Sequence, residues 1–482
     1  MSNETFLWYD FETFGTDTRR DRPAQFAALR TNAALEVIGK PEIIYCRPAD
    51  DVLPQPAACL ITGITPQKAA EHGLPENEFA ARIFKLMSVP DTCVVGYNNF
   101  RFDDEVTRHL FWRNFFDPYS REYANGNSRL DLIDILRMAR ALRPEGMNWP
   151  NYEDGRPSFR LEDIAAANGM DTSNAHDALA DVEATIAVAR LVREHNSKLW
   201  EWALKLRQKH TVVELLHKGQ PLMHASSRYP AEPGCNNAPV LPLCPHPQIA
   251  SQWLVWNLNI DPTPFLDFDG ELLADLYWTP TDDLPEDLDR LPIKLVRTNR
   301  CPMLSPMGVL DEGSAERLRI SRQQVTAHAE LLGDQPEFVA RLARLFAQSR
   351  EFADNDPELD LYNGFPPPGD QRLYPRIRAM TADELARLGT PFLDNRLNEL
   401  LFRYRARLWP ESLDAAERER WHEYRLRRLI DDPELASIRW PEYQLLVEDT
   451  AARHPEKSAL LTDLTTWPET IGLPKLSETQ NQ

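Results

Sequence analysis

The chain lacks several features that define large classes of protein. It has no run of about 18 apolar residues, as a membrane-spanning helix needs, and its only early apolar run, 6–9, is too short for a secretory signal. Its six cysteines form no C-x-x-C pair, which excludes a disulfide-rich scaffold and common zinc-site spacings. Glycine is scarce, with 19 residues against 39 prolines, so stiff connections are expected. We therefore expect a cytoplasmic protein with no membrane contact and with buried, free thiols.

Basic residues are also in deficit, because 54 Lys and Arg stand against 74 Asp and Glu, for a net charge of −20. Phosphate binding is driven by Lys and Arg, so this average taken alone favours a small-molecule enzyme. A strand bound in a groove, however, experiences only the local field, and an acidic metal site adds negative charge that its cations neutralise. The net charge therefore does not decide between these classes.

The length of 482 residues, 42% of them apolar, predicts two or three domains. Residues 5–195 read as strands followed by interleaved helices and strands, which predicts an α/β domain with a mixed sheet flanked by helices. Prolines crowd 221–247 among short strand-like runs such as 253–256 and 293–296, and the chain after 368 is helical. In the first region we expect strands at 5–9, 24–30, 42–47 and 92–97, and helices at 77–87, 103–115, 130–142, 160–168 and 178–193.

The first informative residues are Asp10 and Glu12, at the end of the first expected strand. Positions i and i+2 of a strand point to the same face, so the two carboxylates meet there. Like charges this close repel each other unless a cation lies between them, and carboxylate oxygens suit Mg²⁺ or Mn²⁺. The pair alone is not specific, since it also resembles the D-x-D of phosphatases that use an aspartyl nucleophile, with Glu12 in place of the second Asp.

A second acidic group, Asp103-Asp104-Glu105, begins the expected helix that follows the strand at 92–97. Acids in the first turn of a helix compensate its dipole, and this accounts for Asp104 and Glu105. The same explanation does not exclude Asp103 from facing the end of the first strand.

A third group consists of His176 and Asp181, where another expected helix begins. On a continuous helix five residues turn through about 500°, which would leave these side chains roughly 140° apart. Both can serve one site only if His176 lies on the loop before the helix and Asp181 one turn inside it. Asp177 or Asn174 is the expected N-cap of such a helix.

Taken together, the three groups follow the ordered pattern of DEDDh exonucleases, whose fold is RNase H-like. The chain also resembles the bacterial exonuclease I family more closely. The matching segments include RPAQFAA (22–28), LITGITP (60–66), GYNNFRFDDEVTR (96–108), ALRPEG (141–146), PSFRLE (157–162), KLV (294–296), CP (301–302), LYNGF (361–365) and YRAR (404–407). The resemblance is weakest at 225–290 and after 430. It implies an exonuclease domain at 1–195, an SH3-like domain at 196–350 and a helical domain at 351–482, forming a C-shaped monomer around the strand.

This resemblance implies a 3′-to-5′ exodeoxyribonuclease that hydrolyses single-stranded DNA to 5′-mononucleotides in DNA repair and recombination. Two Mg²⁺ ions about 4 Å apart, replaceable by Mn²⁺, would relieve charge at the phosphate. Asp10, Glu12 and Asp181 would hold one ion, and Asp10 with the phosphate the other. Asp103 would complete the second ion's shell. His176 would take a proton from the attacking water, a task that suits its ordinary pKa near 6.5.

Residues 101–143 contain eight arginines interleaved with tyrosines, and cations with stacking surfaces are what single-strand binding needs. By resemblance, the DNA-contacting positions are Arg108, Tyr119, Tyr123, Arg137, Arg160 and, more weakly, Lys209. Tyr123 stands where relatives can carry tryptophan. The family also docks the acidic, hydrophobic C-terminal tail of single-stranded DNA-binding protein on a basic patch. Arg143 matches one position of that patch, whereas Gln220 lies where a matching lysine is absent.

Two alternatives stay open at the level of the sequence. One is a DEDDh ribonuclease or proofreading subunit, but such proteins need little beyond the first 190 residues. The other is a scaffold that binds a strand without cutting it, which the presence of all five motif residues disfavours.

Overall fold

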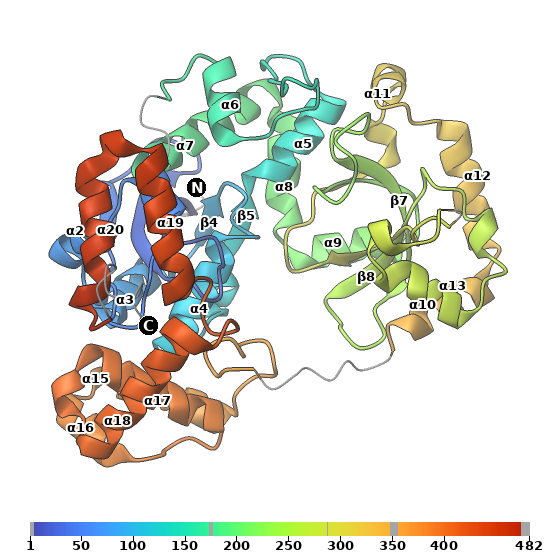
Figure 1. Cartoon of the computed structure of the whole chain (residues 1–482). Coiled ribbons are helices and arrows are strands. Elements are labelled where there is room, and N and C mark those ends of the chain that lie inside the picture. The colour runs from blue at the N-terminus through green and yellow to red at the C-terminus, as the bar shows by residue number, and fades with distance from the viewer. Residues whose placement is uncertain (1–3, 173–176, 287, 348–354, 474–482) are drawn as a thin grey trace. The chain divides into compact units, whose positions relative to one another are not determined.

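The computed structural model describes residues 4–172, 177–286, 288–347 and 355–473 (Figure 1). It divides into two compact units that do not follow chain order. The first unit comprises Met1–Ser128, Ser173–Glu183 and Phe352–Gln482, and the second comprises Arg129–Thr172 and Ala184–Glu351. The boundaries fall within strand β5 (Ser128–Asp131) and helix α7 (Ala178–His195). Within the described stretches, no helix combines the length and apolar character needed to cross a bilayer.

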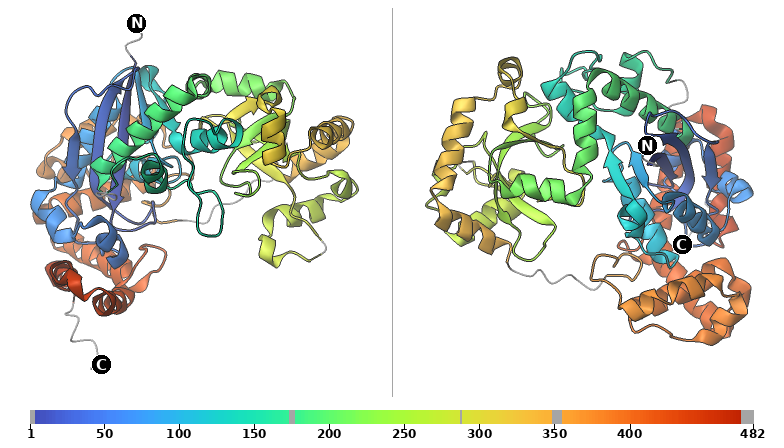
Figure 2. Two further views of the ribbon diagram at one scale, coloured as in Figure 1. Left: turned by 90° about the horizontal axis from the view of Figure 1, so that it is seen from above. Right: turned by 180° about the vertical axis from the view of Figure 1, so that it is seen from behind.

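The first unit is built on a mixed sheet with the order β3-β2-β1-β4. Its strands are β1 (Thr5–Thr13), β2 (Pro23–Asn32), β3 (Glu42–Tyr45) and β4 (Thr92–Gly96). Strand β1 pairs antiparallel with β2, beside which it runs in the left view of Figure 2, and parallel with β4. One face of β1 packs Leu7, Tyr9 and Phe11 into an aromatic core, and Trp8 on the other face is also buried. Burial on both faces explains why this strand reads as a continuous apolar run.

The helices of the first unit come from both ends of the sequence. They are α1 (Pro56–Thr62), α2 (Pro66–His72), α3 (Glu76–Met87), α4 (Asp103–Arg113), η1 (Ser120–Glu122), η2 (Ala124–Gly126), α14 (Pro368–Gln371), α15 (Tyr374–Ala379), α16 (Ala382–Leu388), α17 (Asn395–Leu408), η6 (Pro410–Ser412), α18 (Ala415–Leu426), η7 (Arg427–Asp431), α19 (Trp440–Arg453), η8 (Pro455–Lys457) and α20 (Ser458–Thr470). One apolar cluster joins Phe14 and Cys59 to Tyr443 and Trp467 of the neighbouring helices α19 and α20 (Figure 1). The C-terminal helices therefore share a core with the sheet.

The second unit contains an antiparallel sheet with the order β10-β6-β7-β8-β9. Its elements are α5 (Leu132–Leu142), α6 (Leu161–Ala167), α8 (Ser197–Leu206), α9 (Lys209–His217), β6 (Leu222–Ala225), β7 (Asn237–Pro245), β8 (Gln252–Asn257), η3 (Thr263–Phe265), α10 (Gly270–Trp278), η4 (Thr281–Asp283), β9 (Ile293–Arg297), β10 (Leu304–Pro306), η5 (Met307–Val309), α11 (Glu312–Arg317), α12 (Arg322–Gly333) and α13 (Pro336–Leu345). Trp256 of β8 packs edge-on against Phe265 and Phe338. These contacts fasten α13 to the sheet.

The predicted α/β architecture is confirmed, with three differences in detail. The first strand extends beyond Tyr9 to Thr13, so that both acids lie within it. The helix expected to begin at Leu130 begins instead at Leu132, because Leu130 and Asp131 belong to β5 and the Asp131 carboxylate caps the helix by accepting from the Ile133 amide. The strands β6, β7 and β10 had not been expected, and in β7 prolines interrupt the strand pattern. A bulge in β7 between Pro242 and Cys244 accommodates one of these prolines.

Candidate metal centre and nucleic-acid interface

Three carboxylates meet where β1 ends. Asp10 and Glu12 of β1 and Asp181 of α7 each offer an oxygen, and these oxygens all lie within 4.8 Å of one another. All three side chains are partly buried, and the alternation along β1 places Asp10 and Glu12 on the same face, with Phe11 buried on the opposite one. We name Asp10, Glu12, Asp181 and the adjacent Asp103 the carboxylate cluster.

The electrostatics of this cluster are unfavourable for carboxylates by themselves. Burial raises the pKa of Glu12 to about 8, and the negative charges of Asp181 and Asp103 add to the effect. The pKa of Asp10 is raised well above its ordinary value by burial and then by Asp103 and Glu12. Oxygen ligands alone, held together against their mutual repulsion, fit a hard divalent cation such as Mg²⁺ or Mn²⁺.

Asp103, the first residue of α4, lies beside the strand that carries the acid pair. One of its carboxylate oxygens accepts a hydrogen bond of 3.0 Å from the backbone amide of Phe11. Strand β4 pairs with β1 only as far as Trp8, so the Asp103 side chain bonds β1 beyond the last ladder pair. The turn after β4 brings Asn99 close to Gly96, where a Cβ would lie 2.7 Å from the Cβ of Asn99, so this position requires glycine.

The other two acids of this turn do more than compensate a helix dipole, which is a correction to the sequence interpretation. Asp104 is fully buried and accepts hydrogen bonds from Tyr9 and Arg121. Glu105 accepts from Arg108 and from the hydroxyl of Tyr362.

Helix α7 carries Asp181 one turn from its start. Asp177 caps the helix, because one of its carboxylate oxygens accepts from the backbone amides of Leu179 and Ala180 at 3.1 and 3.2 Å. It is therefore one of the two N-caps that the sequence predicted, while the other, Asn174, and the candidate base His176 lie outside the described residues. Asp177 also adds to the negative charge that Glu12 experiences.

The candidate DNA contacts of the first unit differ strongly in exposure. The side chain of Arg108 is only 4% exposed and pairs with Glu105 and Glu122, while its guanidinium lies 5.4 Å from the ring of Tyr119. Two other arginines of the basic segment are also buried and paired, Arg113 with Glu76 and Arg121 with Asp104. These three side chains therefore do not form the exposed basic surface that their number suggested.

Exposed aromatic rings lie near Arg108 instead. Tyr123 is 67% exposed, and Phe365 is 79% exposed with its ring edge-on to Tyr119 at 5.7 Å. Phe365 and Tyr362 were not singled out as site residues in the sequence. The matching segment LYNGF contains both, and its two aromatic residues in a polar loop were the available signal.

The candidate contacts of the second unit lie on its helical part. The Arg160 side chain is 56% exposed and pairs with Glu162. The Arg137 side chain is only 11% exposed, bonds to Asp134 and lies over the ring of Phe159 at 5.7 Å. Lys209 is exposed at the start of α9.

Arg143, the candidate contact for a protein tail, follows helix α5. Its guanidinium donates to the carbonyl of Val309 at 3.0 Å and approaches Asp311 at 3.3 Å. Val309 ends η5, and Met307 and Gly308 of the same turn line a cavity of about 650 Å³. The cavity wall also includes Lys218, Gln220, Arg322 and the apolar residues Leu215 and Val325.

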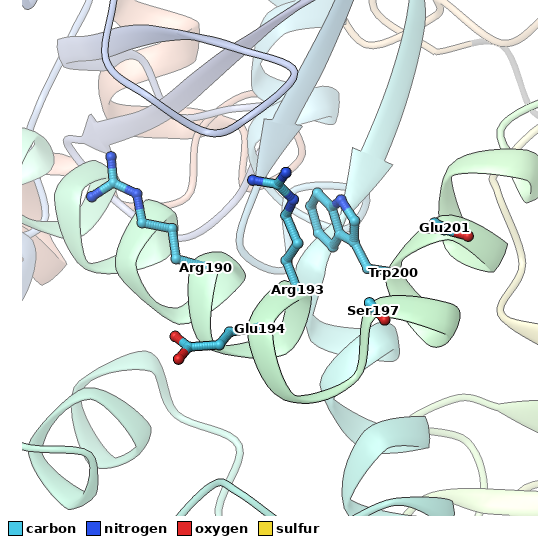
Figure 3. Close-up of a pocket in the computed structure, with 6 residues that line it drawn as sticks. All are labelled: Arg190, Arg193, Glu194, Ser197, Trp200 and Glu201. Atoms are coloured by element: carbon cyan, nitrogen blue, oxygen red, sulfur yellow. The ribbon is translucent and has the colours of Figure 1, made fainter.

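A smaller pocket of about 460 Å³ lies where α7 is followed by α8 (Figure 3). Arg190, Arg193 and Trp200 line it, and Figure 3 shows the two arginines pointing to the same side. Glu194 and Glu201 balance their charge, so the lining favours neither an anion nor a cation.

A sheet whose central strand carries an Asp-x-Glu pair, completed by a helical aspartate, is the arrangement of a metal-dependent nuclease, and comparison with known families agrees with this class. The family described as Exonuclease matches residues 7–189. The Exonuclease I SH3-like domain matches residues 207–348, and the Exonuclease I C-terminal domain matches residues 355–471.

The relatives narrow the class to one family. The exodeoxyribonuclease I of Escherichia coli (strain K12) is 44% identical over 470 residues, which cover 97% of this chain and 98% of the relative. The chain therefore belongs to the exodeoxyribonuclease I family. The crystal structure of E. coli exonuclease I with a dA16 oligonucleotide matches with a TM-score of 0.92 at 42% identity, covering 97% of this chain and 100% of that one. The zinc-bound form of the E. coli complex with single-stranded DNA matches with a TM-score of 0.90 at 42% identity and the same coverage.

Proposed function

We propose that this protein is a 3′-to-5′ exodeoxyribonuclease that hydrolyses single-stranded DNA to 5′-mononucleotides and depends on two divalent metal ions, Mg²⁺ or Mn²⁺. The observation that carries the proposal is the approach of the Asp10, Glu12 and Asp181 oxygens to within 4.8 Å. The relatives named exodeoxyribonuclease I and the oligonucleotide complexes of the E. coli protein support the substrate. Since the relatives are bacterial, the cytoplasm is the proposed location.

The donor set supports a metal-dependent reaction. Without a cation, burial and mutual repulsion favour the protonated forms of Asp10 and Glu12. A divalent ion bound there supplies the positive charge that the phosphate needs during hydrolysis and favours ionisation of water. Asp10, Glu12 and Asp181 would hold the first ion, and Asp103 would support the second. His176 is the proposed acceptor of the proton of the attacking water.

A stacking surface supports binding of a single strand rather than a duplex. Tyr123 and Phe365 are exposed rings on which unpaired bases can stack, partly buried Tyr119 packs against Phe365, and stacking tolerates any sequence. Arg160, Arg137 and Lys209 are the proposed phosphate contacts of the second unit. Because Arg108 is buried between two glutamates, we propose that it orients the ring of Tyr119, in addition to any contact that it makes with DNA.

Digestion of a 5′-labelled oligonucleotide, with and without EDTA, tests this function. We expect a ladder that shortens from the 3′ end, release of 5′-mononucleotides and complete inhibition by EDTA. Single-stranded RNA and duplex DNA serve as parallel substrates. Preference for RNA, or cleavage that survives EDTA, would exclude the proposal.

We also propose three functional domains, 1–195, 196–350 and 351–482. The three family matches support this division, although the compact units cut across it. The two descriptions answer different questions, because a domain shared among relatives is a stretch of sequence whereas a compact unit is a set of packed contacts.

The acidic, hydrophobic C-terminal tail of single-stranded DNA-binding protein is the proposed protein partner. Arg143 and the cavity of Lys218 and Arg322 meet at η5, and the cavity wall offers apolar side chains beside two cations. Binding of a fluorescent tail peptide, followed by anisotropy, should be weakened by Arg143→Glu and unaffected by Arg156→Glu, an exposed arginine of the same unit that pairs with Asp154. Equal affinity for both variants would exclude this surface.

A further inference from the structure

Asp104 lies next to the carboxylate cluster but does not belong to it. Its side chain is completely buried, and one oxygen accepts both the Tyr9 hydroxyl at 2.8 Å and the Arg121 guanidinium at 2.6 Å. Arg121 is equally buried, and neither its Nε nor its second terminal nitrogen has a hydrogen-bond partner among the described residues. A buried cation with a single bonded partner is costly, so the pair is poorly explained as a device for stability.

The pair does, however, connect the two elements that carry the metal ligands. Tyr9 immediately precedes Asp10 on β1, and Asp104 immediately follows Asp103 on α4. The hydroxyl of Tyr9 on β1 therefore donates to Asp104 on α4, and the amide of Phe11 on β1 donates in the same direction to Asp103 on α4. These two bonds cross between the same elements on either side of Asp10.

Backbone contacts reinforce the same turn. The amide of Asp104 donates to the carbonyl of Asn99 at 2.8 Å, and the Thr107 hydroxyl donates to the carbonyl of Asp103 at 2.7 Å. The first turn of α4 is thus fixed from the loop before it and from the helix itself. Arg121, which comes from the separate element η1, donates to Asp104 and so supports this turn from a third element.

We propose that Arg121, acting through Asp104 and Tyr9, is a positioning residue of the metal centre: it holds the first turn of α4 against β1 so that Asp103 keeps the spacing from Asp10 and Glu12 that the metal ions require. The inference deepens the proposed function and rests on it for the identity of the ions. Such supporting contacts usually change metal affinity about 10- to 100-fold when they are removed.

Two alterations test the proposal with the full-length protein. Tyr9→Phe removes one hydroxyl, and the double variant Arg121→Met/Asp104→Asn removes both charges without leaving either unpaired. The matched control is Arg113→Met/Glu76→Gln, which removes a second buried arginine–carboxylate pair, at the far end of α4. Mn²⁺ binding is measured by calorimetry, Mg²⁺ half-saturation by digestion of single-stranded DNA, and folding by circular dichroism and melting temperature.

We expect about 10- to 100-fold weaker Mn²⁺ binding for Arg121→Met/Asp104→Asn and a smaller loss for Tyr9→Phe. The control should lower the melting temperature without moving the Mn²⁺ isotherm. Wild-type affinity in Tyr9→Phe and in a folded double variant overturns the inference, as does a control that weakens binding equally. If the wild-type protein does not digest DNA, the proposed function is refuted. If the double variant nevertheless binds Mn²⁺ more weakly than that wild type, the positioning role still stands.

Discussion

The first unit contains two groups of closely spaced acids, and they differ in what surrounds them. In the carboxylate cluster, Asp10 and Glu12 face other acids, and their pKa values are raised. In the second group, which we name the arginine cluster, Asp51 and Glu358 are interleaved with four arginines. Its members are Arg22, Asp51, Glu358, Arg403, Arg407 and Arg428, whose side chains are no more than 8% exposed.

The arginines reverse the effect of burial. Burial alone would raise the pKa of Asp51, but Arg407, Arg428 and Arg22 together hold it below its ordinary value. Glu358 is shifted downward in the same way, chiefly by Arg407 and Arg22 acting against burial. The protein itself thus supplies the cations that the acids of the arginine cluster need, whereas the carboxylate cluster needs a cation from solution. This difference distinguishes a structural ion network from a metal site.

The largest expected effect breaks the carboxylate cluster. Asp181→Asn should lower the rate of DNA hydrolysis roughly 1000-fold or more, because residues that act as one unit fail together. The melting temperature of the EDTA-treated protein should stay the same or rise, since one repelling charge is gone. A gel assay and a thermal melt measure the two quantities. Near-wild-type hydrolysis by Asp181→Asn would remove this residue from the metal centre.

The same kind of change in the arginine cluster should have the opposite outcome. Arg407→Met leaves Asp51 and Glu358 buried without their main partner, which should cost about 3–5 kcal/mol of unfolding free energy. Urea denaturation measures this loss, and the rate per folded molecule should hardly change. Arg427→Met, which removes an exposed pair with Asp432, is the control and should cost under about 1 kcal/mol. Equal losses of unfolding free energy in Arg407→Met and Arg427→Met would mean that the arginine cluster does not stabilise the fold as a network.

The two clusters should also respond oppositely to pH. The unfolded chain releases the Glu12 proton near pH 4.5, whereas the folded protein retains it until about pH 8, so the metal-free protein should lose stability as pH rises between these values. Asp51 and Glu358, with lowered pKa values, stabilise the fold above their unfolded pKa and lose this contribution only in acid. Melts with EDTA or Mg²⁺ at pH 5.5 and 8 should show a greater rise in melting temperature with Mg²⁺ at pH 8. Glu12→Gln is the control and should reduce that difference. An equal Mg²⁺ effect at both values would contradict the raised pKa.

The smallest expected effect concerns the exposed aromatic rings of the stacking surface, which belong to neither cluster. Phe365→Ala should weaken single-stranded DNA binding roughly fivefold, equivalent to about 1 kcal/mol of stacking. The metal affinity and the melting temperature should stay unchanged, because the ring is largely exposed. Anisotropy with a labelled oligonucleotide in EDTA measures the change, and Leu393→Ala is a matched control on another exposed apolar residue. Identical affinity for Phe365→Ala and wild type would exclude the ring from the binding surface.

The local part of the carboxylate cluster could be predicted from the sequence. Alternation along a strand places Asp10 and Glu12 on one face whatever else the chain does, and the Asp177 cap makes Asp181 a first-turn residue. The order of the acids along the chain then resembled the DEDDh exonucleases, and the matching segments resembled one family among them. None of these steps needs knowledge of distant contacts, because each depends on geometry within a few residues.

The roles of the arginines could not be predicted in this way. Arg108, Arg113 and Arg121 read as a basic strand-binding surface, yet each is buried against a carboxylate from another element or turn. An arginine on a helix has the same local pattern whether it faces solvent or a buried acid. Only the packing of Glu76, Asp104 and Glu122 around α4 and η1 decides between these outcomes.

The sequence by itself determined the α/β class, the face shared by Asp10 and Glu12 and, through its resemblance to known sequences, the family, because periodicity and motifs are properties of the chain. Only the tertiary structure decided which charges are paired. It packed the C-terminal helices with the sheet, supplied arginines to Asp51 and Glu358, and left Asp10, Glu12 and Asp181 among like charges. The physical reason is that a charge is stabilised or penalised by neighbours within a few ångströms, and for a buried group those neighbours come from distant parts of the chain.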